Sequence, residues 1–413
     1  MLSTLFPQAH VRYASLPVVG GTLEEFCIWL DARGYPPEAI RRRVRGARLL
    51  SSALRRRRVR RLSDLTAVGL RSFAPRPTRW TAQLACSLVR SLSQFLQERA
   101  VLAPRPLTPA EEQVATYAQY LTTGRGLAPR TVIRHSARVL EFLRFLRYDT
   151  QPQRLRTLQS ADVEGFMGKN GGRLGRASMQ KVSAVLRSFL RFLAAQRVLP
   201  PGLDARIDSP RCYRGERLPR ALPWETVRQL LGAVDRTTSK GKRDYAMLLM
   251  IGSYGLRASE IAALKLDDVC WRSRTIRVPR PKVGSPLSLP LTDDIATALL
   301  DYLSHGRPPS AHRQLFLRVR IPLGPIESTA VTDVFETWAA RIGLQLPARA
   351  GGPHCLRHSV AVHLLRKGAT LKAIGDLLGH RSAESTSVYL RLQLDDLRNV
   401  ALPLPALAPE VKR

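Results

Sequence analysis

Residues 354–389 read HCLRHSVAVHLLRKGATLKAIGDLLGHRSAESTSVY, and this stretch decides the fold of the C-terminal part. Its pattern of apolar residues predicts short helices over 354–367, 371–378 and 383–388. Gly368 and Gly379 stand where the first two helices should end, because glycine readily adopts the left-handed conformation of a helix C-cap. Tyr389 then directly follows the third helix.

The segment before this stretch predicts a mixture of helices and strands. Amphipathic helices are expected over 224–234, 242–254, 293–303 and 329–342. Residues 275–278 and 287–291 look like two strands, and the sequence Pro-Lys-Val-Gly at 281–284 lies between them. Glycine in a short connection between two such runs is typical of a β-hairpin. We therefore expect a mixed α+β block with a small antiparallel sheet.

The N-terminal half is expected to be wholly helical, which makes the fold class mainly α. Pro-rich seams at 103–106 and 209–220 lack apolar periodicity, as linkers do. They divide the chain into three expected domains, 1–105, 106–210 and 211–413. Apolar spacings of three and four in the first two blocks predict helical bundles.

The first two blocks resemble each other in sequence. Residues 33–37 (RGYPP) with a helix expected over 38–54 parallel residues 125–129 (RGLAP) with a helix expected over 130–146. An internal duplication with small loop insertions would produce this pattern. The alternative is a chance match between two amphipathic helical stretches.

The charge balance indicates a polyanionic partner. Lys and Arg total 66 against 32 acidic residues, for a formal charge of +34. Nucleic acid is the usual partner of such a protein, since neutralised phosphates release counterions. Alternatives are a ribosomal or nucleoid protein, or an Arg-rich composition from GC-rich coding. Phosphate contacts are expected from basic clusters on predicted helices, with a solvated charged face as the alternative: Arg41, Arg45, Arg48, Arg130, Arg134 and Arg138.

Several classes of protein are not expected. The five cysteines are scattered without a Cys-x-x-Cys pair, which argues against a zinc ribbon or a disulfide framework and fits a reducing cytoplasm. No segment approaches the roughly 18 uninterrupted apolar residues of a membrane span. The first residues lack the pattern of a signal peptide. We expect a cytoplasmic, nucleoid-associated bacterial protein with no membrane partner.

Polar residues in the last block form an ordered series. Arg257 follows Gly255 at an expected helix start, in the sequence YGLRASEI at 254–261. His354 and Arg357 are three residues apart on one helix, so both project from the same face. His380 ends a short helix, and Tyr389 lies nine residues further on.

This series resembles the motifs of the tyrosine recombinase (phage integrase) family. The family pattern has Gly-Leu-Arg-x-Ser-Glu, a Lys in a β-hairpin, His-x-Leu-Arg-His, Leu-Gly-His and then Tyr. The matching positions here are Arg257, Lys282, His354, Arg357, His380 and Tyr389. The resemblance covers about 254–389, and residues 126–131 also resemble the start of the family's helical, SAM-like core-binding domain. Residues around Lys282 depart from the pattern, because the further basic residues of the family hairpin are replaced by Val-Gly-Ser-Pro.

The resemblance implies a chemistry for these residues. Arg257 and Arg357 would stabilise the charge that develops on a phosphodiester under attack. Tyr389 would form a 3′-phosphotyrosine link, with His354 as the expected base and His380 donating to the phosphate. Lys282 would protonate the leaving 5′-oxygen. Neither a metal nor another cofactor is implied, and the covalent intermediate conserves the bond energy, so ATP is not required.

Other side chains near the motifs have plainer interpretations. Glu260 is expected to orient Arg357 or to form a structural ion pair. His358 and His363 are expected to be packing residues. The i, i+4 spacing of His354 and His358 could suggest zinc, but a nearby Glu and a third ligand are missing from the pattern.

The resemblance also implies partners. These are double-stranded DNA with inverted half-sites, a homotetramer formed on two DNA sites, and sister recombinases as an open alternative. A helix over 390–400 and the apolar tail after it would dock on a neighbouring protomer or pack within the chain. The competing functions are a type IB topoisomerase-like enzyme and a catalytically silent DNA-binding regulator.

Overall fold

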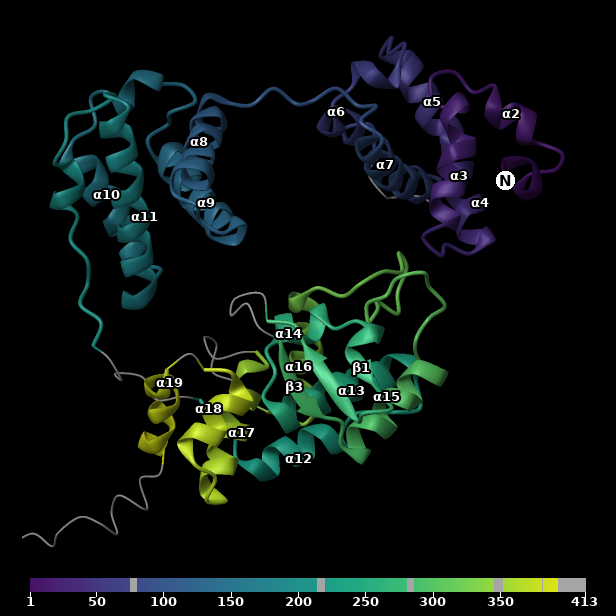
Figure 1. Cartoon of the computed structure of the whole chain (residues 1–413). Coiled ribbons are helices and arrows are strands. Elements are labelled where there is room, and N and C mark those ends of the chain that lie inside the picture. Colours follow the sequence, from purple (N-terminus) through teal and green to yellow (C-terminus); the bar gives the residue numbers. More distant parts are fainter. Residues whose placement is uncertain (75–79, 214–219, 281–285, 345–351, 381, 393–413) are drawn as a thin grey trace, which may run out of the picture. The chain divides into compact units, whose positions relative to one another are not determined.

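The computed structural model describes residues 1–413 except 75–79, 214–219, 281–285, 345–351, 381 and 393–413. Helices dominate the described residues, and three short strands form a small sheet (Figure 1). The expected fold class, mainly α with a small antiparallel sheet, is confirmed. The chain divides into two compact units, which are Met1–Ser52 with Pro77–Leu88 and Arg217–Arg413, and Ala53–Arg76 with Val89–Glu216.

The first hundred residues contain nine helical elements within the described part. They are α1 (Leu2–Leu5), α2 (His10–Ala14), η1 (Gly20–Thr22), α3 (Leu23–Asp31), α4 (Pro37–Arg45), α5 (Ala47–Arg56), η2 (Leu62–Asp64), α6 (Ala67–Arg71) and α7 (Trp80–Glu98). The prediction of a single helix over 38–54 is wrong, because the helix is interrupted at Gly46, between α4 and α5. A Cβ at Gly46 would lie 2.8 Å from the carbonyl oxygen of Leu84, so only glycine allows this approach to the backbone of α7.

The bundle that follows has its own core. Its elements are α8 (Pro109–Gln119), η3 (Tyr120–Gly124), α9 (Pro129–Phe145), η4 (Pro152–Leu155), α10 (Ser160–Gly171), α11 (Arg176–Ala195) and η5 (Leu203–Arg206). The side chain of Thr108 accepts a hydrogen bond from the backbone nitrogen of Glu111, and the carboxylate of Glu111 accepts one from the backbone nitrogen of Thr108. These two bonds form a capping box at the start of α8. The buried hydroxyl of Tyr117 donates to Ser188 at 2.9 Å and thereby links α8 to α11.

Unusual backbone conformations recur at corresponding places in the first hundred residues and in this bundle. Left-handed residues occur at these paired positions: Gly34 and Gly126, Arg58 and Arg147, Ala100 and Arg197. The residue after each non-glycine donates to a carbonyl five residues earlier, as in Val59 to Leu54 and Tyr148 to Leu143. The left-handed conformation costs a non-glycine residue roughly 1–2 kcal/mol, so the surrounding structure must impose it. Its recurrence at paired positions indicates that both regions have the same local fold.

The C-terminal part combines helices with the sheet. Its elements are α12 (Trp224–Gly232), α13 (Ser239–Tyr254), α14 (Ala258–Ala263), η6 (Leu266–Asp268), β1 (Val269–Cys270), β2 (Thr275–Val278), β3 (Leu287–Pro290), α15 (Asp293–His305), α16 (Ser328–Arg341), α17 (His354–Arg366), α18 (Leu371–Leu378), α19 (Ala383–Ser387) and η7 (Val388–Leu392). The strands are antiparallel in the order β1-β2-β3, with Ile276 opposite Leu289. The expected hairpin strands are confirmed, whereas its turn lies outside the described residues.

Helix α13 is the central helix of this part, with most of its side chains buried. Asp244, which is fully buried, accepts hydrogen bonds from Arg243 and from the indole nitrogen of Trp338 on α16. Lys240 lies 2.7 Å from the same carboxylate. These donors satisfy a charge that would otherwise be expensive to bury.

The last described helices return the chain to α17. Gly379 ends α18 in the left-handed conformation at φ 61°, as the sequence predicts. Tyr389 of η7 then packs with Ala361 and Val362 of α17 and Ile374 of α18. Most of the helix expected over 390–400 lies outside the described residues. Among the helices that the structure describes, none combines the length and apolar character needed to cross a membrane.

Candidate active site

Arg257 is the N-cap of α14 and directly follows a sharp change in backbone direction. Gly255 ends α13 at φ 63°, and a Cβ there would lie 2.4 Å from Leu378. Glu260 accepts hydrogen bonds from both the backbone nitrogen and Nη1 of Arg257, at 2.8 and 2.6 Å. Because Glu260 is buried and Arg257 is one-third exposed, the carboxylate anchors a guanidinium that still reaches the surface. Glu260 therefore forms an ion pair with Arg257, which matches the second of its two expected roles, and its recorded hydrogen bonds are not with Arg357.

Arg357 is held from both sides by the backbone. Its side chain is 1% exposed, with Nη1 donating to the carbonyl of Gly255 at 2.6 Å and Nη2 to that of Leu378 at 2.5 Å. Burial, followed by the charge of Arg257, lowers the pKa of Arg357 to about 10. The group therefore remains a cation at neutral pH, with its plane fixed between the ends of α13 and α18.

His380 directly follows the left-handed Gly379. Its Nδ1 lies 2.8 Å from Oγ1 of Thr386, a buried residue of α19. Burial and then the charges of Arg357 and Arg257 lower the pKa of His380 to about 4. The ring is therefore neutral at neutral pH, and among the described residues no hydrogen bond is recorded for its Nε2.

Tyr389 stacks beside His380, with ring centroids 6.2 Å apart and planes 15° from parallel. The tyrosine is 1% exposed, and its hydroxyl lies 2.9 Å from Nδ1 of His358. Burial raises the pKa of Tyr389, while Arg357 and Arg257 oppose that rise. The phenol is therefore protonated in this state. His358 was expected only to be a packing residue, so its contact with the hydroxyl of Tyr389 was not predicted from the sequence.

His354 occupies the first turn of α17, at the surface. Its ring meets that of His358 edge to face, with centroids 4.6 Å apart. Desolvation of the ring, followed by the charges of Arg357 and Arg257, lowers the pKa of His354, as it does for His380. The structure thus links the four predicted residues to Tyr389 in different ways: His380 stacks on its ring, Arg357 and Arg257 act on it through their charges, and His354 meets it only through His358.

Arg280, just beyond β2, is a neighbour that the sequence did not single out. Its side chain is 5% exposed, lies 3.8 Å from Glu260 and donates to the carbonyl of Leu377 at 3.2 Å. Its Nε is buried without a hydrogen-bond partner among the described residues. The predicted Lys282 lies two positions further on, outside the described residues. In such an Arg-rich chain, nothing in the sequence distinguished Arg280 from other arginines.

The predicted DNA-binding arginines lie on other helices. Arg134 and Arg138 of α9 line a groove of about 510 Å³ together with Lys181 of α11, while Arg130 is exposed on the first turn of α9. In the N-terminal part, Arg41 and Arg45 lie 3.4 and 3.7 Å from Glu38. The guanidinium of Arg48 lies over the ring of Tyr13.

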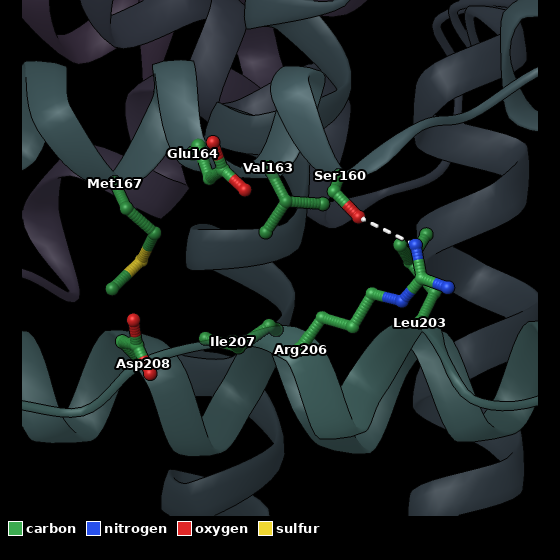
Figure 2. Close-up of a pocket in the computed structure, with 8 residues that line it drawn as sticks. All are labelled: Ser160, Val163, Glu164, Met167, Leu203, Arg206, Ile207 and Asp208. Carbon is green, nitrogen blue, oxygen red and sulfur yellow. Dashed lines mark hydrogen bonds between the residues drawn. The ribbon is translucent and has the colours of Figure 1, made fainter.

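A second hollow, of about 170 Å³, lies between α10 and the chain around η5 (Figure 2). Arg206 donates to Ser160 across it at 3.4 Å. Its other lining residues are apolar or carboxylic. Within the described part of the chain, no three His, Cys, Asp or Glu side chains are arranged to hold a metal ion.

Comparison with known proteins places this geometry in a family. The profile of the Phage integrase family matches residues 220–395, and that of the Phage integrase, N-terminal SAM-like domain matches residues 114–197. An integrase/recombinase of Sinorhizobium fredii, y4rA, is 33% identical over 93% of this chain and 94% of its own length. The chain belongs to the phage integrase family of tyrosine recombinases.

Further comparisons agree with this assignment. The tyrosine recombinase XerD of Listeria monocytogenes is 28% identical over 70% of this chain and 96% of its own. The crystal structure of XerH bound to difH in a pre-cleavage complex superposes with a TM-score of 0.55 at 17% identity, over 72% of this chain and 98% of that one. A lambda integrase dimer bound to a core site gives a TM-score of 0.53 at 16% identity, over 72% and 99%. These two structures show the shared fold of this tyrosine recombinase.

Proposed function

We propose that this recombinase cuts and rejoins duplex DNA at specific sites through a covalent 3′-phosphotyrosine bond to Tyr389. The observation that carries the proposal is the cluster in which His358 and His380 contact Tyr389, His354 packs on His358, and the charges of Arg357 and Arg257 reach the phenol. A phosphodiester is an anion, and its negative charge grows as a nucleophile attacks. Fixed cations at that position lower the barrier, because they are oriented before the reaction begins.

Each residue of the cluster has a role in this proposal. Arg257 and Arg357 bind the nonbridging oxygens of the scissile phosphate, and Nε2 of His380 donates to the same group. Lys282 protonates the 5′-oxygen as it leaves. His354, at the mouth of the cluster, is the base expected from the sequence or a further phosphate ligand. The phosphotyrosine conserves the energy of the bond that was cut, so the reverse attack by a 5′-hydroxyl rejoins DNA without ATP.

A nicked suicide substrate tests the covalent step. A nick beside the scissile phosphate lets a short fragment diffuse away, so the protein remains attached to DNA. Duplexes that tile the DNA on both sides of the coding sequence would supply candidate sites. The wild type should give an adduct on a denaturing gel, whereas Tyr389→Phe should bind the same DNA without an adduct. Equal adduct from Tyr389→Phe would refute the proposal.

Two other functions are separated by their products. A type IB topoisomerase-like enzyme would relax DNA without joining strands from two sites, whereas a recombinase gives strand exchange between them. A silent DNA-binding regulator would keep its activity in cells after Tyr389→Phe. Strand exchange that depends on Tyr389 supports the present proposal against both.

A biological setting completes the proposal. We propose that the enzyme integrates, excises or resolves a mobile element, as a tetramer on two sites with inverted half-sites. It would act in the cytoplasm, at the nucleoid. The C-terminal tail would dock on a neighbouring protomer.

The domain roles extend this proposal. Residues 106–210 would be the core-binding domain, whose groove with Arg134, Arg138 and Lys181 suits a phosphate backbone. Residues 211–413 would form the catalytic domain. The paired left-handed positions support a duplication in which residues 1–105 are a second such bundle, with a DNA-binding or protein-contact role. Deleting residues 1–103 should weaken site binding or synapsis, and unchanged binding and synapsis would refute that role.

A further inference from the structure

The hydroxyl of Tyr389 contacts an imidazole that was expected only to be a packing residue. Oη lies 2.9 Å from Nδ1 of His358, a normal distance for a direct hydrogen bond. We propose that His358 is the catalytic base of this site and accepts the phenol proton as Tyr389 attacks phosphorus. The inference rests on the recombinase chemistry proposed above, since it assigns a step within it.

Geometry favours His358 over His354 for this step. The two rings meet edge to face at 79°, so they are neighbours, but the tyrosine hydroxyl is bonded to His358. For Nδ1 to accept the proton, neutral His358 must carry its hydrogen on Nε2. His354 is closer to solvent and remains available to the phosphate.

The charges around His358 link the proton transfer to the arrival of DNA. It faces His354 and Arg357 on its own helix, His380 after α18 and Tyr389 on η7. Burial, followed by His354 and Arg357, lowers the pKa of His358 to about 4, so without DNA the imidazole is neutral and the phenol keeps its proton. A phosphodiester bound at the arginines adds a negative charge, which raises the pKa of His358 by favouring imidazolium.

The step balances without a further reactant. The bond between Oη of Tyr389 and phosphorus forms as the bond from phosphorus to the 5′-oxygen breaks. The phenol proton moves to Nδ1 of His358, and Lys282 supplies a proton to the 5′-oxygen. In the rejoining reaction each proton returns, which regenerates the free tyrosine.

Two substitutions of the same residue separate a base from a structural contact. Asparagine places an amide oxygen near the position of Nδ1, so His358→Asn can accept the hydroxyl hydrogen bond but cannot take the proton. His358→Leu removes both abilities. His363→Asn is the matched control, because His363 lies on the same helix but stacks on Trp224. Single-turnover adduct formation on the nicked duplexes is measured from pH 5.5 to 8.5, with DNA affinity and melting temperature measured for each variant.

A base role predicts that His358→Asn and His358→Leu are equally defective, by about 100-fold or more, the usual contribution of a general base. The wild-type rate should fall at low pH as His358 becomes protonated, and both variants should lose this fall while they keep DNA affinity. A near-normal or increased rate in His358→Asn would overturn the inference, since the histidine would then only hold or restrain the tyrosine. If the wild type itself forms no adduct, the proposed function fails together with this inference. A wild-type adduct with an undiminished variant removes the inference alone.

Discussion

Nδ1 of His380 lies 2.8 Å from Oγ1 of Thr386, a fully buried side chain one helical turn before Tyr389. This contact joins the histidine at the end of α18 to the segment that carries the nucleophile. It also uses one ring nitrogen, so Nε2 is the nitrogen that remains for a phosphate oxygen.

Removing the hydroxyl of Thr386 should disturb this arrangement. Thr386→Val keeps the shape of the side chain but leaves Nδ1 of His380 without its partner, so we expect adduct formation to slow by about tenfold, the equivalent of a hydrogen bond near 1.4 kcal/mol. Thr386→Ser retains the hydroxyl and should recover most of the rate. Equal rates for the valine and serine variants would show that the contact does not position His380.

Gly379 tests the packing of Arg280 against the site. A Cβ at Gly379 would lie 1.5 Å from Nη1 of Arg280, whereas a Cβ at Gly368, which is also left-handed, would have open space within 4 Å in the described part of the chain. Gly368→Ala should therefore cost only the backbone strain, roughly 1–2 kcal/mol. Gly379→Ala should be more destabilising in urea titrations and should also slow cleavage. Similar unfolding free energies for the two variants would contradict the close packing.

The buried carboxylate of Asp244 should dominate the stability of the C-terminal part. Asp244→Ala removes the partner of Arg243 and leaves that guanidinium, itself buried, without its ion pair. Breaking a buried pair in this way typically costs about 3–5 kcal/mol. Asp301→Ala, which removes a partly exposed carboxylate paired with Lys242, is the control and should cost much less. Chemical denaturation of both variants gives the comparison.

Acid should destabilise the fold through its buried histidines. The pKa values of His358 and His380 are lowered to about 4, chiefly by burial, while an unfolded histidine takes up its proton near 6.5. The unfolded state therefore binds more protons between these values, so stability is kept above pH 6.5 and lost as the pH falls towards 4. The melting temperature should drop between pH 7 and 5, and less steeply in His380→Asn. Parallel pH profiles for that variant and the wild type would contradict the assignment.

The sequence predicted the parts of this recombinase that depend on local patterns. The spacing of Arg357, His380 and Tyr389 and the left-handed glycine after α18 could be read directly, because helix periodicity and capping are properties of neighbouring residues. The hairpin strands followed from alternation in the same way.

Features that depend on contacts between distant segments could not be read from the sequence. Helix periodicity places His354 and His358 on one face, but which imidazole meets Tyr389 depends on how the chain returns after Gly379. For Glu260 the sequence left open whether it would orient Arg357 or form a structural ion pair, and the capping geometry of α14 pairs it with Arg257. The break at Gly46 likewise results from the approach of α7, which lies far along the chain.

The central claim is that Tyr389 itself becomes bonded to DNA, and peptide mapping tests it most directly. Adduct formed on a nicked duplex would be digested with nuclease and protease, and mass spectrometry would locate the remaining nucleotide. The account predicts a nucleotide with a 3′-phosphate bond on the peptide that contains Tyr389. A nucleotide on any other residue, or DNA cleavage with no covalent peptide, would contradict it.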